Sequence, residues 1–213
     1  MKKYLLTIAT PNITEWCTEF IANQKAYADA RGYEHIVSTE LHWPDLHPSF
    51  SKVWEIYKVL KDDNIVIWAD VDVAFMNQRV DLADLLVDDI FLAAYHQQNW
   101  DKWKYLCAGL TVWRANAQSI AFLDEWLKRC EKRTQPDFPW EQWYLDEMIR
   151  ETNYNNIRAC TGPEIGCFAT EIWHDGVIWD RSMPTVHLAC QQWTWETKRQ
   201  AYLDGLKTVK PLA

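Results

Sequence analysis

The sequence predicts an α/β protein with a mostly parallel central sheet and helices on both of its faces. Strand-like segments alternate with segments of helical periodicity along most of the chain, and this alternation is typical of parallel strands joined by helices. The 213 residues, of which 48% are hydrophobic, are enough to bury one sizeable core. We therefore expect a single domain over residues 1–213.

The chain opens with a predicted β-α-β unit. Residues 3–9 are suited to a strand, and Asn12 with Glu15 three places on resembles a capping box that begins a helix. Side chains at helical spacing continue from there to Gly32, a residue typical of helix ends. A second strand is expected from Tyr33 to Ser38.

The alternation of elements continues to about residue 150. We expect, in order, a loop at 39–48, a helix across 53–60, a strand at 64–69, a short helix near 81–86, strands at 90–95 and about 105–114, and helices at 116–133 and 140–150. Asn116 is the expected cap of the helix at 116–133, whose apolar face holds Ile120, Leu123, Trp126, Leu127 and Cys130. After residue 151 the pattern weakens to a strand at 184–188 and a closing helix near 195–206.

Composition argues against two classes of partner. The net charge of -8 and the pI near 5.2 disfavour broad binding to nucleic acid. No stretch is long and apolar enough to span a bilayer, since the first apolar run breaks at Thr10 and Pro11. The six cysteines lack the spacing of a zinc site, which favours reduced thiols in a cytoplasm.

Tryptophan is unusually abundant. The chain has 14 tryptophans, more than a core of this size usually holds. Flat aromatic rings pack in cores and also stack on the apolar faces of sugars. Carbohydrate therefore becomes a candidate ligand.

Two aspartates follow the most strand-like segment. In IVIWADVDVAF, residues 65–75, the apolar run ends in Asp70 and Asp72. Ligands of open α/β sheets bind outside the carboxyl ends of the strands, and two close carboxylates suit Mg²⁺ or Mn²⁺, which commonly also bind substrate phosphates. The implied ligand is a metal-bound diphosphate, while the plain alternative is a turn or a helix cap.

Four segments together resemble a known group of enzymes. They are HPSFSKVWEIYKVLKDDNIVIWADVDVAFMN (47–77), LCAGLTVWRAN (106–116), EQWYLDEM (141–148) and VHLAC (186–190). In their order and spacing they resemble the metal-dependent glycosyltransferases of GT-A fold, especially the α-galactosyl and α-xylosyl transferases of fungi and plants and the glycogenin-like and bacterial lipooligosaccharide galactosyltransferases. The resemblance implies a Rossmann-like domain with a nucleotide-binding part at about 1–77 and a part for acceptor and donor sugar at about 78–213.

The resemblance also implies a metal site and a donor site. Asp70 and Asp72 correspond to the pair that holds Mn²⁺ or Mg²⁺, with Asp70 also contacting the donor, and His187 corresponds to the histidine that completes the site. Lys52 matches a basic residue near the donor, where a cation could neutralise the leaving diphosphate. Thr10 and Asn12 would meet the base and ribose, although Asn12 could serve only as a helix cap.

Further residues are assigned to the sugar by the same resemblance. Ala108 and Gly109 match an Asn-Ala-Gly or Asn-Ser-Gly turn near the sugar, with Cys107 in the place of the asparagine. Glu141 and Gln142 match an acidic-Gln pair that borders the donor sugar. Candidate catalytic residues are Gln142, Glu141 and Asp146, the last of which shares a helix face with Gln142.

The chain departs from the resemblance after the histidine. Related enzymes often continue as HFxGC or HxxGxxK, but here His187 is followed by LACQQW, without the glycine or the phosphate-binding lysine. Another cation would then have to stabilise the diphosphate, and Lys198 and Arg199 are candidates.

The implied reaction transfers a sugar from a nucleotide-diphosphate sugar, a UDP-sugar in the first place, to an acceptor hydroxyl with retention of configuration. An inverting enzyme would instead need a base, for which Asp146 and Glu141 are candidates. The acceptor is a glycan or another hydroxyl compound. The segment YHQQNWDKWKY (95–105) has aromatics for a sugar, and its lysines would also suit a modified DNA base.

We expect a cytoplasmic enzyme of bacterial or viral origin. Two alternatives stay open. One is a phosphohydrolase of haloacid dehalogenase type, in which a strand also ends in DxD but is followed by Thr or Ser at the position that Ala74 occupies here. The other is a non-enzymatic, tryptophan-rich carbohydrate-binding module.

Overall fold

The structure is a computed structural model that describes residues 1–97, 105–132, 140–152, 155–168, 183–188, 194, 196–198 and 200. The elements are β1 (Lys3–Ile8), α1 (Pro11–Arg31), β2 (Glu34–Ser38), α2 (Pro48–Val59), β3 (Ile65–Ala69), β4 (Val73–Phe75), the 3₁₀ helix η1 (Leu82–Leu85), β5 (Leu92–Gln97), β6 (Tyr105–Arg114), α3 (Ala117–Lys132), α4 (Glu141–Thr152), β7 (Ile157–Cys160), α5 (Gly162–Ile165), β8 (Cys167–Phe168) and β9 (Thr185–His187).

A six-stranded sheet in the order β2-β1-β3-β6-β5-β7 forms the centre of the fold. The pairs β1–β2, β1–β3 and β5–β7 are parallel, whereas β6 runs antiparallel to both of its neighbours. A second sheet has the order β4-β9-β8. The predicted α/β class with a mostly parallel sheet is confirmed, and the single reversed strand β6 brings the end of β3 beside Gly109 and Leu110.

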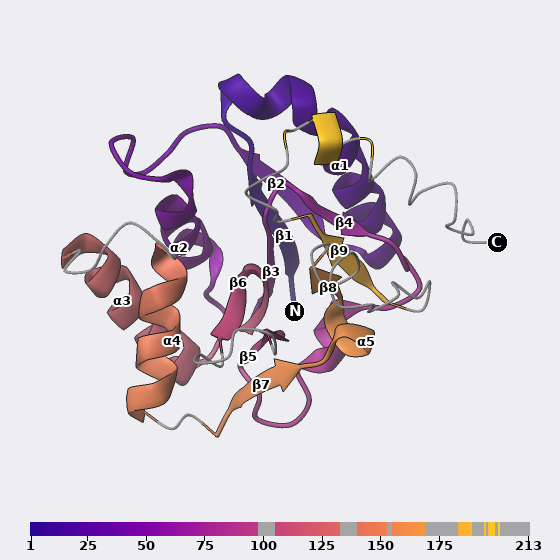
Figure 1. The fold of residues 1–213 in the computed structure, drawn as a ribbon. Helices are drawn as coiled ribbons and strands as arrows, with labels where there is room; N and C mark the ends of the chain where they lie inside the picture. Colours follow the sequence, from indigo (N-terminus) through magenta and orange to yellow (C-terminus); the bar gives the residue numbers. More distant parts are fainter. Residues whose placement is uncertain are drawn as a thin grey trace.

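Helices lie on both faces of the sheet (Figure 1). The helices α2, α3 and α4 pack on one face over Val66 and Trp68 of β3, and α1 packs with η1 and β4 on the other face over Ile65 and Ile67. Successive side chains of a strand point to opposite faces, so the continuous apolar run of β3 serves two cores at once. A strand buried on both faces is expected to read as such a run.

Two sequence predictions about helices were wrong in detail. The first helix is capped by Thr10 with Pro11 as its first residue, because proline has no N–H to leave unpaired at that position; Asn12 is not the cap. Ile120 was predicted on the apolar face of α3 but is 40% exposed. The cap at Asn116 is confirmed, since its Oδ1 accepts a hydrogen bond from the Ser119 N–H at 2.8 Å.

The second half of the chain was predicted less completely. The short strands β4, β7 and β8 have no counterpart in the prediction, whereas the strand expected at 184–188 is present as β9. Residues 196–198 and 200 are helical, and the rest of the closing helix expected at 195–206 lies outside the described residues. Most of the segment 95–105 and Arg199 also lie outside them.

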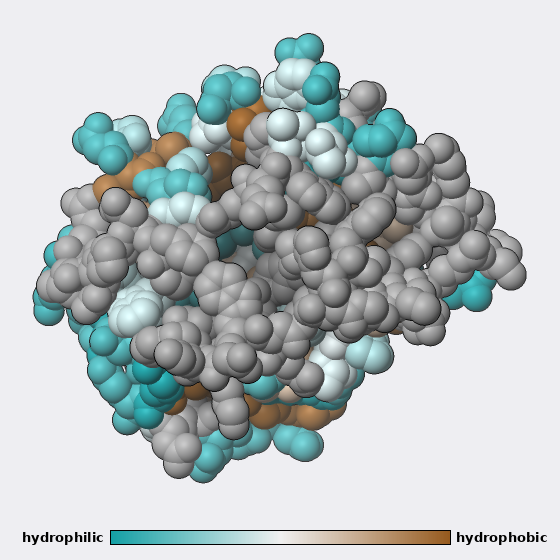
Figure 2. Space-filling view, in the orientation of Figure 1, coloured by the Kyte–Doolittle hydropathy of each residue, from teal (hydrophilic) through white to brown (hydrophobic). Residues whose placement is uncertain are grey.

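Exposed hydrophobic side chains are few on the described surface. Among the residues that are coloured in Figure 2, hydrophilic ones lie mainly along the margins of this face and hydrophobic ones form small patches. Among the described residues, no helix is long and apolar enough to cross a membrane. The side chains of Cys17, Cys107, Cys130 and Cys160 are buried, and none of these four forms a disulfide.

Helix α1 braces strand β4 through a buried amide. The Nδ2 of Asn23 donates to the Phe75 carbonyl at 3.0 Å, and the Phe75 N–H donates to the Asn23 Oδ1 at 2.6 Å. Next to it, the Gln24 Nε2 donates to the carbonyls of Asp70 and Val73 at 3.1 and 3.0 Å. The helix therefore supports the backbone on both sides of Asp72.

Replacing Asn23 by leucine should lower the free energy of unfolding by about 1–3 kcal/mol, because it leaves buried backbone groups of Phe75 unpaired. Urea unfolding followed by circular dichroism measures this. The control Gln118→Leu, at an exposed position of α3, should change the midpoint little. Equal midpoints for the two variants would contradict the bracing role of Asn23.

Candidate active site

The chain turns sharply where β3 ends. The Asp70 N–H donates to the Gly109 carbonyl at 2.7 Å, and the Val73 N–H donates to the Asp70 carbonyl at 2.9 Å. This turn carries the chain into β4, whose residue Val73 pairs with His187 of β9. The pairing of β4 with β9 thus places a histidine from near the C-terminus beside the two aspartates.

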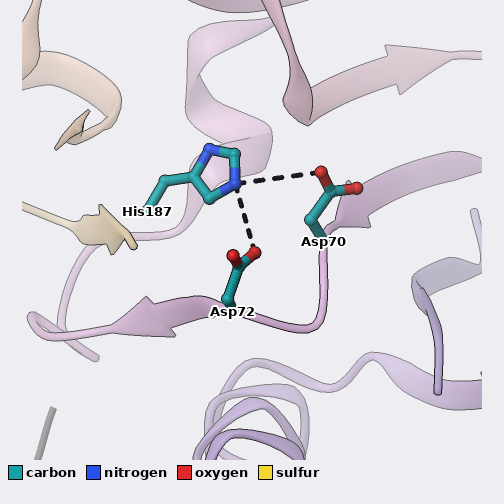
Figure 3. Close-up of side chains that lie close together, drawn as sticks. All are labelled: Asp70, Asp72 and His187. Carbon is teal, nitrogen blue, oxygen red and sulfur yellow. Dashed lines mark ion pairs between the residues drawn. The ribbon is translucent and has the colours of Figure 1, made fainter. Parts of the chain in front are cut away.

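Asp70, Asp72 and His187 form a group of three metal-type ligands (Figure 3). One ligand atom from each lies within 4.8 Å of the others. The His187 Nε2 is 3.2 Å from the Asp72 Oδ1 and 3.8 Å from the Asp70 Oδ2. Two carboxylates and an imidazole fit a divalent cation such as Mn²⁺ or Mg²⁺.

Each aspartate is paired with a lysine and has one oxygen nearest the histidine; the Asp70 Oδ2, which faces His187, also accepts a hydrogen bond from the Lys52 Nζ at 3.3 Å. The Asp70 Oδ1 accepts from the Trp68 indole N–H at 2.7 Å and lies 2.9 Å from the Lys52 Nζ. The Asp72 Oδ2 lies 2.6 Å from the Lys198 Nζ. The Asp70 Oδ2 and Asp72 Oδ1 therefore face His187 in an orientation that the lysines maintain.

The charges of the site are strongly coupled. Burial alone would raise the pKa of Asp72, but His187 and Lys198 hold it far below its usual range. Burial would likewise lower the pKa of His187, but the Asp72 carboxylate and the Cys107 thiol raise it to about 10. Asp72 is thus an anion, as a metal ligand must be.

Lys52 is a buried cation at the centre of a network. Its side chain is 3% exposed, and its Nζ lies 2.9 Å from the Asp70 Oδ1, 2.7 Å from the Glu141 Oε1 and 3.2 Å from the Ala108 carbonyl. Although burial opposes its charge, Asp70 and Glu141 raise the pKa of Lys52 above its usual range. An enclosed lysine of this kind holds Asp70 in place, and its contact with the donor diphosphate stays a prediction.

The predicted sugar-binding residues meet at β6 and the start of α4. The Gln142 Oε1 accepts from the Ala108 N–H at 3.0 Å, and Glu141 reaches the same region through Lys52. Gly109 lies against the imidazole, because a Cβ on Gly109 would be 2.1 Å from the His187 Cε1. The lack of a side chain at Gly109 therefore makes room for the metal-type histidine.

The remaining predicted site residues are Asp146, Thr10 and Asn12, which have other partners. Asp146 is buried on α4 with its Oδ2 2.9 Å from the Arg150 Nε, and burial raises its pKa. The Thr10 hydroxyl donates to the Asn12 Oδ1 at 2.5 Å in the turn between β1 and α1. The neighbouring Ala9 packs in one cluster with Val71, the residue between the two aspartates, so this turn borders the site.

Two contacts were absent from the sequence prediction. Gln24 lies within the predicted first helix, and it binds the backbone on both sides of Asp72. The Cys107 Sγ lies 3.6 Å from the His187 Nδ1. The available signal for Gln24 was its place, next to Asn23, as a polar residue among apolar ones on the buried face of α1.

The substitution Gly109→Ala should weaken Mn²⁺ binding by more than tenfold, because the new methyl group would have to displace His187. Titration of Mn²⁺ followed by electron paramagnetic resonance of the free ion measures the affinity. The control Gly32→Ala strains the left-handed end of α1, where φ is 71°, and should lower stability without changing the affinity. Unchanged Mn²⁺ affinity in Gly109→Ala would contradict the role of His187.

An α/β sheet whose strand β3 ends in a DxD turn, beside a histidine from β9, is the arrangement of the GT-A class, and the three side chains could hold a metal ion. The family model for nucleotide-diphospho-sugar transferases matches residues 49–201, which is more than half of the chain. The chain belongs to this family. Its members use a nucleotide-diphosphate sugar as donor, so the protein is a glycosyltransferase, and the phosphohydrolase and lectin-like alternatives fall away.

Solved structures of glycosyltransferases share the fold. A glycosyltransferase involved in glycosylation of the major capsid of PBCV-1 is 14% identical, with 98% of this chain and 100% of that chain covered and a TM-score of 0.73. The galactosyltransferase LgtC, in complex with donor and acceptor sugar analogues, is 12% identical, with 98% and 97% covered and a TM-score of 0.57. Mouse xyloside xylosyltransferase 1 is 9% identical, with 91% and 100% covered and a TM-score of 0.52. No curated protein sequence matches the chain.

Proposed function

We propose that the protein transfers a sugar from a UDP-sugar to a hydroxyl group of a glycan, with retention of configuration and with Mn²⁺ or Mg²⁺ bound by Asp70, Asp72 and His187. The observation that carries this proposal is the convergence of these three side chains at the end of β3, in a chain of the nucleotide-diphospho-sugar transferase family. A bound divalent cation would neutralise charge on the departing diphosphate.

Lys198 is the proposed second cation for the diphosphate. Its Nζ lies 2.6 Å from the Asp72 Oδ2, so it reaches the metal group from a position well after His187. A lysine at that place can supply the positive charge that the segment after His187 lacks. Preorganised cations near a leaving group stabilise the charge that develops as the bond breaks.

The environment of the acidic candidates supports retention. The Glu141 side chain is 4% exposed and paired with Lys52, and Asp146 is buried beside Arg150. Neither carboxylate is presented as an open general base, which an inverting enzyme would need. Gln142, oriented by the Ala108 N–H, is the proposed polar group that steadies the positively charged sugar.

A sugar acceptor is supported by aromatic rings beside the site. The ring of His47, at the start of α2, stacks on Trp140 with centroids 3.7 Å apart and an interplanar angle of 3°. Trp140 directly precedes Glu141 in the chain. Flat rings at this place suit the apolar face of a hexose or pentose.

Proton NMR of a transfer reaction tests the proposed function. The purified chain is incubated with Mn²⁺, a panel of UDP- and GDP-sugars, and a mixture of mono- and disaccharide acceptors. We expect consumption of one UDP-sugar, a new anomeric signal of retained configuration, and no reaction in EDTA. An inverted product would contradict retention. Release of phosphate from a simple phosphate ester, without any reaction of nucleotide sugars, would contradict the transferase function.

A further inference from the structure

A buried thiol touches the side of His187 that faces away from the aspartates. The Cys107 side chain lies on β6 and is 2% exposed, and its Sγ is 3.6 Å from the His187 Nδ1. The other ring nitrogen, Nε2, faces Asp70 and Asp72. The two nitrogens of this histidine therefore have different partners on opposite sides of the ring.

We infer that Cys107 is a positioning residue that sets the tautomer and orientation of His187 for metal binding; this inference rests on the proposed metal site. A histidine that binds a cation through Nε2 must carry its proton on Nδ1. The Cys107 sulfur is placed to accept the hydrogen bond from that Nδ1–H. Partners of this kind, behind a metal-binding histidine, hold its ring and tune its affinity.

The sulfur is itself fixed in place. The Gly109 N–H donates to the Cys107 Sγ at 3.3 Å, and the space left by the missing Cβ of Gly109 receives the imidazole ring. Cys107 thus contacts His187 through its sulfur. Gly109, two residues on, has no side chain and so leaves room for the imidazole ring. Both contacts come from one strand, β6, whereas His187 lies on β9 of the second sheet.

Cys107 is not itself a ligand in this arrangement. The group of ligand atoms within 4.8 Å of one another, searched among the described residues, consists of Asp70, Asp72 and His187. Cys107 reaches that group only through the opposite nitrogen of the ring. A soft thiolate ligand would favour Zn²⁺ or Cd²⁺ over Mn²⁺, so metal preference separates a ligand from a positioning residue.

The test measures Mn²⁺ affinity in three variants by electron paramagnetic resonance of the free ion. Cys107→Ala should weaken Mn²⁺ binding by about 10- to 100-fold, the usual effect of losing such a partner. Cys107→Ser, which retains a hydrogen-bond acceptor, should recover part of the affinity. Cys130→Ala removes an equally buried thiol from the core-facing side of α3 and should leave the affinity unchanged.

The outcomes separate this inference from the proposed function. Wild-type Mn²⁺ affinity in Cys107→Ala would overturn the positioning role, and a selective loss of Cd²⁺ affinity would show a ligand instead. Failure of the wild-type chain to bind Mn²⁺ would overturn the proposed metal site and the inference together. If Cys107→Ala does not fold, nitrogen-15 NMR of the wild-type chain loaded with Mg²⁺ still decides: a proton on the His187 Nδ1 is expected, and a proton on Nε2 would overturn the inference.

Discussion

Replacing Lys52 by methionine is expected to lower the free energy of unfolding by about 3–5 kcal/mol, the usual cost of removing one partner of a buried ion pair. Lys52 has a 3% exposed side chain between Asp70 and Glu141. Methionine fills a similar volume but leaves both carboxylates without their cation. The Asp70 carboxylate should also lose its orientation, so Mn²⁺ affinity should fall in the same variant.

Urea unfolding followed by tryptophan fluorescence measures the stability of Lys52→Met. The matched control is Lys128→Met, which removes an exposed lysine paired with Asp124 on the surface of α3 and should change the midpoint little, because exposed pairs contribute little to stability. Similar midpoints for the two variants would show that Lys52 does not hold the network together.

Replacing Asp72 by asparagine is expected to abolish Mn²⁺ binding and to lower the transfer rate by more than roughly 100-fold. Loss of a residue that only supports a metal ligand typically costs about 10- to 100-fold, and loss of a ligand itself should cost more. Asp72 is the carboxylate closest to His187, at 3.2 Å from Nε2. The amide keeps the shape of the side chain but removes the negative charge that a divalent cation requires. The same change also removes the anion beside Lys198.

The control for this prediction is Asp81→Asn. Asp81 is another partly buried aspartate paired with a lysine, at 2.7 Å from the Lys3 Nζ, but it does not belong to the metal group. Asp81→Asn should lower stability and keep Mn²⁺ binding and transfer. An Asp72→Asn variant that binds Mn²⁺ like the wild-type chain would exclude this aspartate as a ligand.

The local parts of the fold were predictable because their signals lie within short stretches of sequence. The alternation of strands and helices over residues 3–69 follows from periodicity and from Gly32, whose positive φ of 71° ends α1. The two aspartates after β3 also form a short local pattern, so they identify a candidate ion site at the end of this strand. The N-cap was misplaced because Pro11 allows a helix to begin one residue after Thr10.

The contacts between site residues far apart in sequence could not be predicted from the spacing of residues. His187 joins Asp72 only through the pairing of β9 with β4, and the resemblance to a family, not periodicity, pointed to it. Lys52 of α2 is buried because α2 packs near Glu141 at the start of α4. No local sequence pattern predicts this packing. The contact between Gly109 and the His187 ring likewise joins strands that are far apart in sequence.

Calorimetric titration of UDP into the purified chain, in Mn²⁺ and then in EDTA, tests the central claim most directly. If Asp70, Asp72 and His187 hold the cation that binds the donor diphosphate, UDP should bind in Mn²⁺ and lose at least about tenfold in affinity in EDTA, a change of about 1.4 kcal/mol. UDP binding of equal affinity in Mn²⁺ and EDTA, or no UDP binding in either, would contradict the proposed metal-dependent donor site.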